Sequence, residues 1–323
     1  MEIIAEIYLL FIKEKITFCL EDGVMSIKCI FCLNEFEKGS EEHVFPDSLG
    51  GNFKIYNVCK GCNEKLGSNV DDKLANNILS QLYRLVNKIP GKKGVVPNPF
   101  KYGHLKGDPD HKLHYNLSKD GDPVSLTVVP NVSDSQDGRV FVRADASNED
   151  TVVKIVNTKL TRSGNEPKTK EEILSQANYE KIENPEMEME LTFNLEDYKK
   201  AIIKIIYEMT CYWLGDEYLS DPIAQVLREQ IFSEDLGDER LNGFVDLVGV
   251  KEHTFKLLTD EDSHTAILIR DHENLYCYTN VMGTFEGMML VTNQASKYGI
   301  EVGKLLKSII ESKEVIEKEL EKQ

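Results

Sequence analysis

The chain has 323 residues, of which 41% are hydrophobic and 29% are charged, and its formal net charge is −17. This length is sufficient for two domains with a sizeable buried core. No uninterrupted apolar run of about eighteen residues occurs, so we expect no transmembrane helix and no membrane partner. Neither a Walker phosphate-binding loop nor a dinucleotide-binding glycine motif is present, which excludes the commonest nucleotide-binding classes. We expect a cytoplasmic protein.

Residues 1–24 precede the first recognisable motif and are partly apolar. Charged residues interrupt the apolar stretch, and it lacks the basic start and the small-residue cleavage site of a secretory signal. Met25 opens the next segment, just before the first cysteine pair. We therefore expect residues 1–24 to be an N-terminal extension, either from a start codon assigned upstream of Met25 or as a helix packed on a second domain.

Four of the seven cysteines form two Cys-x-x-Cys pairs, Cys29 with Cys32 and Cys59 with Cys62. Two such pairs bind one tetrahedral Zn²⁺, each from a tight turn. The odd number of cysteines argues against a disulfide framework, and a thioredoxin-like redox site would need only one pair. The spacing therefore predicts a structural zinc.

The segment between and after the cysteine pairs predicts two strands followed by a helix. Val44 and Phe45 form a short β-favouring run that ends at Pro46. A second strand is expected over residues 53–58, where apolar and polar residues alternate, and a helix over residues 63–85, where apolar residues recur at helical spacing. The predicted order is therefore strand, strand, helix, joined by zinc.

Several shorter motifs lie inside this zinc frame: Glu42-His43-x-x-Pro46, Gly50-Gly51 and Cys59-x-x-Cys62-Asn63. In this combination residues 28–72 resemble the zinc-stapled branch of the HNH (ββα-metal) endonucleases, which includes phage endonuclease VII-like enzymes. The resemblance implies a general base at His43 and a catalytic divalent cation held by Glu42 and Asn63. It also implies that the four cysteines hold zinc.

These residue types also suit phosphodiester hydrolysis on chemical grounds. A neutral imidazole such as that of His43 can take a proton from water near physiological pH. A carboxylate and an amide oxygen, from Glu42 and Asn63, suit Mg²⁺ or Mn²⁺ better than a softer metal. Adjacent strand residues point to opposite faces, so we expect a bend or bulge at Glu42 and His43. Asp71 is interpreted as part of a solvated helix face.

The fold class expected is α+β, with a small zinc-bound ββα-metal module followed by a larger mixed α/β domain. We place an HNH nuclease domain at residues 25–90, a linker rich in Pro and Gly at 91–100, and an acidic α+β domain at 101–323. In the last domain, strands are predicted at residues 113–117, 124–129, 139–144, 266–269, 275–279 and 287–292, and helices at 147–160, 168–177, 194–214, 222–232 and 302–322.

The charge is distributed unevenly along the chain. Residues 1–100 carry a net charge of −1, and residues 101–323 carry −16. Lysine and arginine make most contacts to nucleic-acid phosphates, so the acidic part is not expected to lie along DNA. We interpret it as a regulatory or targeting domain.

The sequence therefore predicts a metal-dependent endonuclease that hydrolyses phosphodiester bonds of nucleic acid, with DNA as the expected partner and a role in restriction or phage defence. Zn²⁺ is the expected structural cofactor, and Mg²⁺ or Mn²⁺ the catalytic one. Two alternatives stay open: a non-catalytic zinc module that binds nucleic acid or protein, and a nuclease effector gated by a ligand. An activating ligand, a partner protein or an oligomer is compatible with the sequence.

Overall fold

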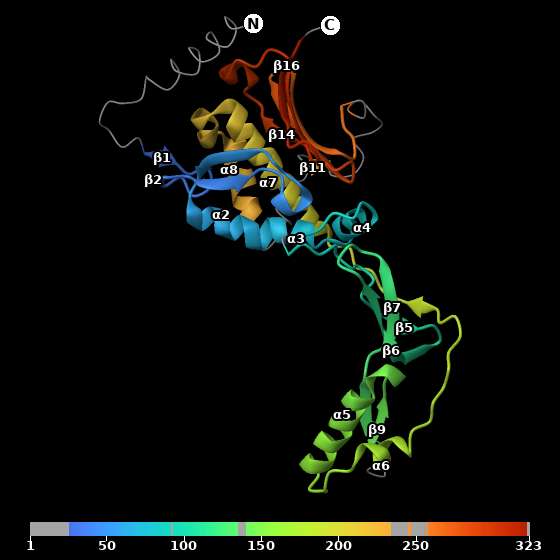
Figure 1. Ribbon diagram of the computed structural model, residues 1–323. Coiled ribbons are helices and arrows are strands. Elements are labelled where there is room, and N and C mark those ends of the chain that lie inside the picture. Colours follow the sequence, from blue (N-terminus) through green and yellow to red (C-terminus); the bar gives the residue numbers. More distant parts are fainter. Residues whose placement is uncertain are drawn as a thin grey trace, which may run out of the picture.

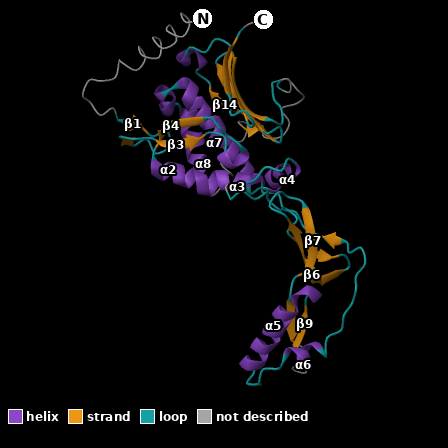
Figure 2. Ribbon diagram, viewed as in Figure 1, coloured by secondary structure: helices purple, strands orange, loops and turns teal. Residues whose placement is uncertain are grey.

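The computed structural model describes residues 26–91, 93–134, 140–233, 245–246, 255 and 258–321. The expected N-terminal extension, residues 1–24, lies outside this part of the chain. Figure 1 shows a body, formed by the N-terminal module with helices α7 and α8 and a curved sheet, and an arm that extends away from it. Both parts contain helices and strands, which confirms the mixed helix and strand class (Figure 2).

The N-terminal module contains two small antiparallel strand pairs, β1 with β2 and β3 with β4, followed by a helical segment. Its elements are β1 (Ile27–Lys28), β2 (Glu35–Phe36), β3 (Ser40–His43), β4 (Lys54–Val58), α2 (Lys60–Leu66), η2 (Gly67–Asp71), α3 (Asp72–Ala75) and α4 (Ile78–Val86). The order strand, strand, helix is confirmed for β3, β4 and α2. The first strand was predicted at Val44 and Phe45, but it ends at His43. Val44 and Phe45 are both fully buried, which the alternation of a regular strand does not allow.

The helical segment after Cys59 begins earlier than predicted and is interrupted. The helix α2 begins at Lys60, and a π-helical turn joins it to α3. The chain then breaks at Asn76 and Asn77, where the side chain of Asn77 accepts a hydrogen bond from the backbone N–H of Leu79 and so caps α4. An asparagine that caps the next helix ends the previous one, although the apolar periodicity continues across the break.

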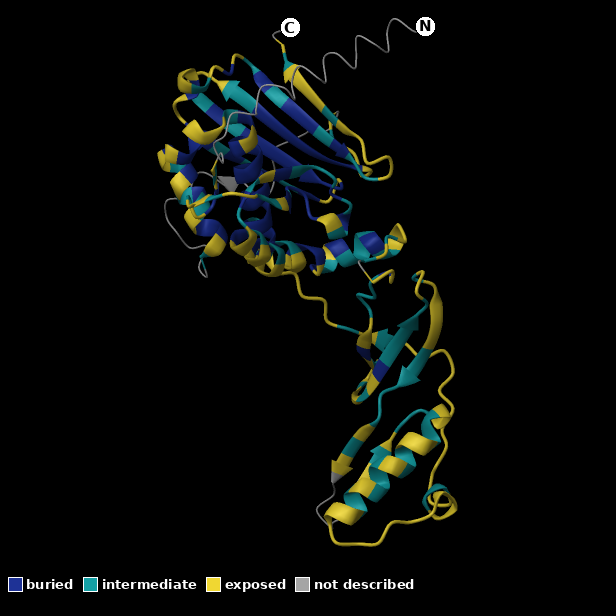
Figure 3. Cartoon of the chain, turned by 60° about the vertical axis from the view of Figure 1, so that its left-hand side comes forward, coloured by how far each residue is buried: buried dark blue, intermediate teal, exposed yellow. Residues whose placement is uncertain are grey.

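The arm comprises residues 97–193 and holds few buried side chains (Figure 3). Its strands form a four-stranded sheet in the order β10-β5-β6-β7 and a separate β8–β9 hairpin, on which α5 packs. Its elements are β5 (Tyr102–Leu105), β6 (Asp108–Leu117), β7 (Pro123–Val128), β8 (Asn131–Asp134), β9 (Val140–Arg143), α5 (Glu149–Arg162), α6 (Lys170–Leu174) and β10 (Met187–Glu188). The predicted elements correspond to β6, β7, β9, α5 and α6, but β6 begins five residues earlier than expected and α6 is five residues shorter. Strands β5, β8 and β10 were not predicted.

The chain leaves the body and returns to it at nearly the same place. The side-chain amide of Asn77, at the start of α4, donates a hydrogen bond of 3.3 Å to the carbonyl oxygen of Asn194, at the start of α7. The Nζ of Lys73 also lies 3.2 Å from a carboxylate oxygen of Asp197. The arm is therefore an insertion between two segments that contact each other in the body.

The remainder of the body consists of two helices and a six-stranded antiparallel sheet in the order β11-β14-β13-β12-β15-β16. Asn194 caps the first helix, and Gly215, with φ of +72°, follows its last residue, as predicted. The elements are α7 (Leu195–Leu214), α8 (Pro222–Phe232), β11 (Val245–Asp246), β12 (Ser263–Asp271), β13 (Asn274–Val281), β14 (Phe285–Thr292), β15 (Gly303–Ile309) and β16 (Val315–Leu320).

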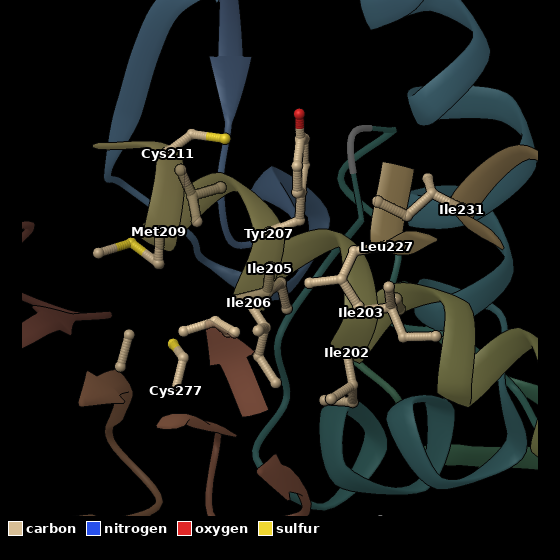
Figure 4. Close-up of a cluster of buried hydrophobic side chains, with 14 of the residues drawn as sticks. Ile202, Ile203, Ile205, Ile206, Tyr207, Met209, Cys211, Leu227, Ile231 and Cys277 are labelled. Carbon is tan, nitrogen blue, oxygen red and sulfur yellow. The ribbon is translucent and has the colours of Figure 1, made fainter. Parts of the chain in front are cut away.

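The helix α7 is the centre of the hydrophobic core. Figure 4 shows Ile203 near Leu227 and Ile231 of α8, and Ile206 near Cys277 of β13. The same continuous cluster of buried side chains includes Phe45 and other residues of the N-terminal module. A helix that is apolar on almost every side needs a partner on every side, and here the module, α8 and the sheet provide them.

Residues 101–323, expected to follow the linker as one domain, thus occupy two places in the described structure. Residues 97–193 form the arm, whereas α7, α8 and the sheet share a core with the N-terminal module. Among the residues that the structure describes, no helix has both the length and the apolar composition that a membrane crossing requires.

The helix predicted at residues 302–322 is wrong, because these residues form the β15–β16 hairpin. Strand β15 pairs with the central strand β12, with Leu305 opposite Ile267. On β16, Glu319 pairs across the hairpin with Lys304, at 2.8 Å between the charged atoms. The charge pattern that suggested a solvated helix thus belongs to an edge strand, on which Glu319 forms a cross-strand ion pair.

Candidate active site and metal centre

The four cysteines of the two predicted pairs come together in the structure. Their sulfur atoms all lie within 4.8 Å of one another, and the Sγ atoms of Cys32 and Cys59 are 3.8 Å apart. A tetrahedron with Zn–S bonds of about 2.3 Å has S–S edges of about 3.8 Å. Burial raises the pKa of the Cys29 and Cys62 thiols, and a bound cation would offset this cost of forming thiolates. The cluster is therefore compatible with one structural zinc ion.

His43 is the last residue of β3, and its side chain is 23% exposed. Its Nε2 lies 3.9 Å from Oδ1 of Asp47, in the short 3₁₀ turn that follows. Burial lowers the pKa of His43, and the nearby carboxylate of Asp47 offsets this only in part. The imidazole is therefore neutral near physiological pH and can accept a proton.

Glu42 lies on the opposite face of β3 and is 2% exposed. The register of β3 against β4 shifts between Ser40 and Glu42, so an irregularity occurs just before the step where we expected it. Beyond this shift the alternation resumes, and the carboxylate of Glu42 faces the interior while the side chain of His43 is partly exposed. One carboxylate oxygen of Glu42, Oε1, lies 2.8 Å from the Nζ of Lys204.

Asn63 lies in the first turns of α2, which packs beside β3. Its Nδ2 donates a hydrogen bond of 2.8 Å to the carbonyl oxygen of Glu41. This bond holds the amide next to the strand that carries Glu42 and His43. The amide oxygen keeps its capacity to accept a hydrogen bond or to bind a hard cation. The structure thus places Asn63 beside β3, whereas the side chains of Glu42 and His43 lie on opposite faces of that strand.

A buried charged cluster, which the sequence did not predict, lies beside β3. We call it the Lys204 cluster; it comprises Lys204 and the carboxyl groups of Glu42, Asp71 and Glu208. The Nζ of Lys204 lies 3.3 Å from Asp71 and 3.2 Å from Glu208, in addition to its contact with Glu42. The side chains of Lys204 and Glu208 are fully buried. The interpretation of Asp71 as a solvated residue is wrong, because its side chain is 17% exposed and contacts this ammonium.

Burial controls the protonation of this cluster. It raises the pKa of Asp71 to about 6 and raises the pKa of Glu208 well above its usual range. Burial alone would lower the pKa of Lys204, but Asp71, Glu208 and Glu42 outweigh it and raise that pKa above its ordinary value. The three carboxyl groups thus favour the ammonium form of Lys204, and burial favours the neutral form of Glu208.

One signal in the sequence could have revealed this cluster. Lys204 is a charged residue within the otherwise apolar stretch from Ala201 to Tyr207, and Glu208 follows it by four residues. A lysine in an apolar helix with an acidic residue at this spacing indicates a buried pair rather than a solvated face. The partners Glu42 and Asp71, however, carry no local signal that connects them to α7.

The comparison with known proteins decides the nature of the module. Residues 29–79 match the HNH endonuclease family. The matched segment contains both cysteine pairs and the residues Glu42, His43 and Asn63, which confirms the resemblance drawn from the sequence. The HNH module indicates a nuclease and implies that nucleic acid binds to it. No curated protein and no solved structure matches the chain.

Proposed function

We propose that this chain is a metal-dependent endonuclease that hydrolyses phosphodiester bonds of DNA. One observation carries the proposal: the partly exposed His43, whose pKa burial lowers, follows Glu42 on β3, and the amide of Asn63 is hydrogen-bonded to the same strand, in a module with four clustered cysteines. The family match supports the nuclease class. DNA as substrate, and a role in restriction or phage defence, are parts of the proposal.

In this proposal His43 is the general base. Its imidazole takes the proton from a water molecule that attacks the phosphorus. The carboxylate of Asp47, 3.9 Å from Nε2, stabilises by its charge the imidazolium formed by the transfer. Partial exposure of the side chain leaves room for a nucleic-acid strand to approach.

Glu42 and Asn63 would hold the catalytic cation. A carboxylate and an amide oxygen are hard donors, and this donor set fits Mg²⁺ or Mn²⁺. Such an ion, when bound, offsets the negative charge that develops on the phosphate oxygens. The hydrogen bond from Asn63 to the Glu41 carbonyl keeps the amide beside β3 before any ion arrives. The four cysteines fit a structural zinc by number, distance and ligand type.

A cleavage assay with the purified, zinc-loaded full chain tests this function. Supercoiled plasmid, linear duplex, single-stranded DNA and RNA would be incubated with Mg²⁺ or Mn²⁺. We expect metal-dependent nicking of DNA by the wild type and loss of about 10²–10⁴-fold in rate for His43→Ala, the usual contribution of a general base. The control is His272→Asn, because His272 is 95% exposed and asparagine tolerates its positive φ of 55°. Equal cleavage by wild type and His43→Ala would contradict the assignment.

One observation favours a second function, that of a non-catalytic zinc module that binds nucleic acid. The carboxylate of Glu42 is buried and paired with Lys204, so this ligand is already engaged by a cation of the protein. A wild-type chain that binds DNA but cleaves none of the four substrates, with either metal, would establish this alternative.

A further inference from the structure

Lys204 connects helix α7 to the strand that carries the candidate catalytic residues. It lies in α7, far outside the segment 29–79 that matches the HNH endonuclease family. Its Nζ donates hydrogen bonds to the main-chain carbonyls of His43, at 2.6 Å, and Val44, at 3.3 Å. It also contacts the carboxylate of Glu42 at 2.8 Å. One ammonium group thus holds the side chain of one candidate residue and the main chain of the next.

The Lys204 cluster also joins three elements of the fold. Glu42 belongs to β3, Asp71 to η2, and Glu208 lies one turn beyond Lys204 on α7. A fully buried ammonium is expensive to remove from water, and the attraction of its partners offsets this cost only when the geometry is good. Hydrophobic residues would cost less at this position if cohesion were the sole requirement.

Cohesion between α7 and the module does not depend on Lys204 alone. The hydroxyl of Tyr207 donates a hydrogen bond to the carbonyl oxygen of Ile30, and the ring of Phe31 packs at 5.3 Å from that of Tyr207. The continuous hydrophobic cluster spans both parts. The contacts that distinguish Lys204 are therefore those to Glu42 and His43.

We infer that Lys204 is a positioning residue for the candidate cation site: it fixes the Glu42 carboxylate and the peptide after His43 in the conformation that binds the divalent cation. This inference rests on the proposed function, because it concerns the same site. Groups that orient a metal ligand without touching the metal typically change metal affinity by about 10–100-fold when they are lost. Lys204 would act in this way from a helix that the family motif does not include.

Four variants separate positioning from folding. Lys204→Met alone leaves Glu42, Asp71 and Glu208 without their cation. The principal variant is therefore Lys204→Met/Glu208→Leu, which also removes the fully buried carboxyl group of Glu208 and leaves only Glu42 and the partly exposed Asp71 without that cation. Glu208→Gln keeps the ammonium and its contacts to Glu42 and His43. Lys200→Met removes another buried lysine from the same helix. Among the described residues, Lys200 forms no ion pair with the carboxyl groups of the Lys204 cluster. Asn63→Ala identifies the candidate site: the Mn²⁺ binding that is lost in this variant is the binding that belongs to this site.

The measurement is Mn²⁺ affinity of the zinc-loaded full chain by calorimetry, with thermal unfolding, zinc content and plasmid cleavage recorded in parallel. We expect the double variant to stay folded and keep its zinc but to bind Mn²⁺ at the Asn63-dependent site at least about tenfold more weakly. Glu208→Gln and Lys200→Met should stay within about twofold of wild type, because they leave the contacts to Glu42 and His43 in place.

Three results would overturn the inference. The first is unchanged Mn²⁺ affinity in the folded double variant. The second is tighter binding, which would make Lys204 a competitor of the cation. The third is a wild-type chain with no Asn63-dependent Mn²⁺ site. A wild type that binds Mn²⁺ at this site but cleaves no nucleic acid would contradict the proposed function alone, and the Mn²⁺ affinities of the variants would still decide the role of Lys204.

Discussion

The hydroxyl of Tyr207 in α7 donates a hydrogen bond to the main-chain carbonyl of Ile30, which lies between Cys29 and Cys32, the two cysteines of the first pair. Tyr207 is fully buried, and Arg228 of α8 donates to the same hydroxyl oxygen at 3.1 Å. The first cysteine turn is thus held from outside the module by the two helices of the body. A zinc module that depends on distant helices behaves as part of the larger core.

Tyr207→Phe should therefore destabilise the whole protein. Removing the hydroxyl leaves the Ile30 carbonyl buried without this donor, which costs about 1–3 kcal/mol of unfolding free energy. Denaturant unfolding measures this cost, and zinc release to a chelator should also become faster. Tyr212→Phe is the matched control, because the hydroxyl of Tyr212 binds Glu317 at an exposed position and its loss should cost less. Equal effects of the two variants would contradict this account.

Loss of one zinc ligand should remove the metal and unfold the module. Cys62→Ser replaces a buried thiolate by a poor zinc ligand, so the bound zinc per chain, measured by elemental analysis, should fall from about one to near zero. Cys277→Ala is the control, because Cys277 is buried in β13, away from the sulfur cluster. Unchanged zinc content in Cys62→Ser, or equal loss in both variants, would refute the four-thiolate site.

Acid should weaken the fold through His264. This residue of β12 is fully buried, its ring stacks on Phe45 at 5.1 Å, and its Nε2 lies 3.2 Å from the carbonyl oxygen of Leu49. Burial lowers the pKa of His264 to about 4. The unfolded chain binds a proton near pH 6.5 and the folded chain only near pH 4, so stability is lost as pH falls through this window.

The loss attributable to His264 is about 3 kcal/mol at the lower end of the window. His264→Phe should flatten the pH dependence of the unfolding free energy between pH 6.5 and 4 by this amount, as measured by denaturant unfolding at several pH values. His272→Asn, at an exposed position, should leave it unchanged. A slope that is the same in His264→Phe and in wild type would count against the buried neutral imidazole.

Deletion of the arm should leave the body intact. Asn194, at the end of the arm, accepts a hydrogen bond from Asn77 at the start of α4, so a Gly/Ser linker long enough to span α4 can replace residues 97–193 and reconnect the body. We expect zinc content to be kept and the thermal transition to stay cooperative, because the main hydrophobic cluster contains no residue of the arm. An aggregated or unfolded product would show that the arm contributes to the core.

Truncation after Lys93 should give the opposite result. Leu66, Val70 and Leu74 are fully buried within the cluster shared with α7, and the truncated chain would expose them. We expect a poorly folded fragment without cleavage activity, as judged by circular dichroism and plasmid nicking. A ligand-gated nuclease predicts instead that removal of the acidic part releases cutting, so a folded and active fragment would favour that alternative.

Local chemistry made much of the fold and of the site predictable. The cysteine pairs and Glu42-His43 stand close together in the sequence, and their spacing alone indicates their grouping. The helix α7 was equally accessible, since Asn194 and Gly215 mark its two ends. These features depend on residues within a few turns of one another.

The errors come from contacts between distant segments. Residues 302–322 have a charge pattern compatible with a helix, and only pairing with β12 makes them strands. The burial of Glu42 depends on Lys204, which is separated from His43 by 161 positions. Asp71 looked solvated for the same reason. Local periodicity cannot predict which side chains of the N-terminal module contact α7 or the sheet, because those elements follow the arm in the sequence.

The position of Lys204 in the chain has a consequence for synthesis. A ribosome adds His43 161 residues before Lys204, and the whole arm is made in between. Domains form as their segments emerge, so a growing chain carries the nuclease motif for nearly half of its synthesis without the lysine that contacts it. A chain that stops early, or that is cut within the arm, lacks the same group. During translation, the chain therefore contains the nuclease motif well before the complete site can form.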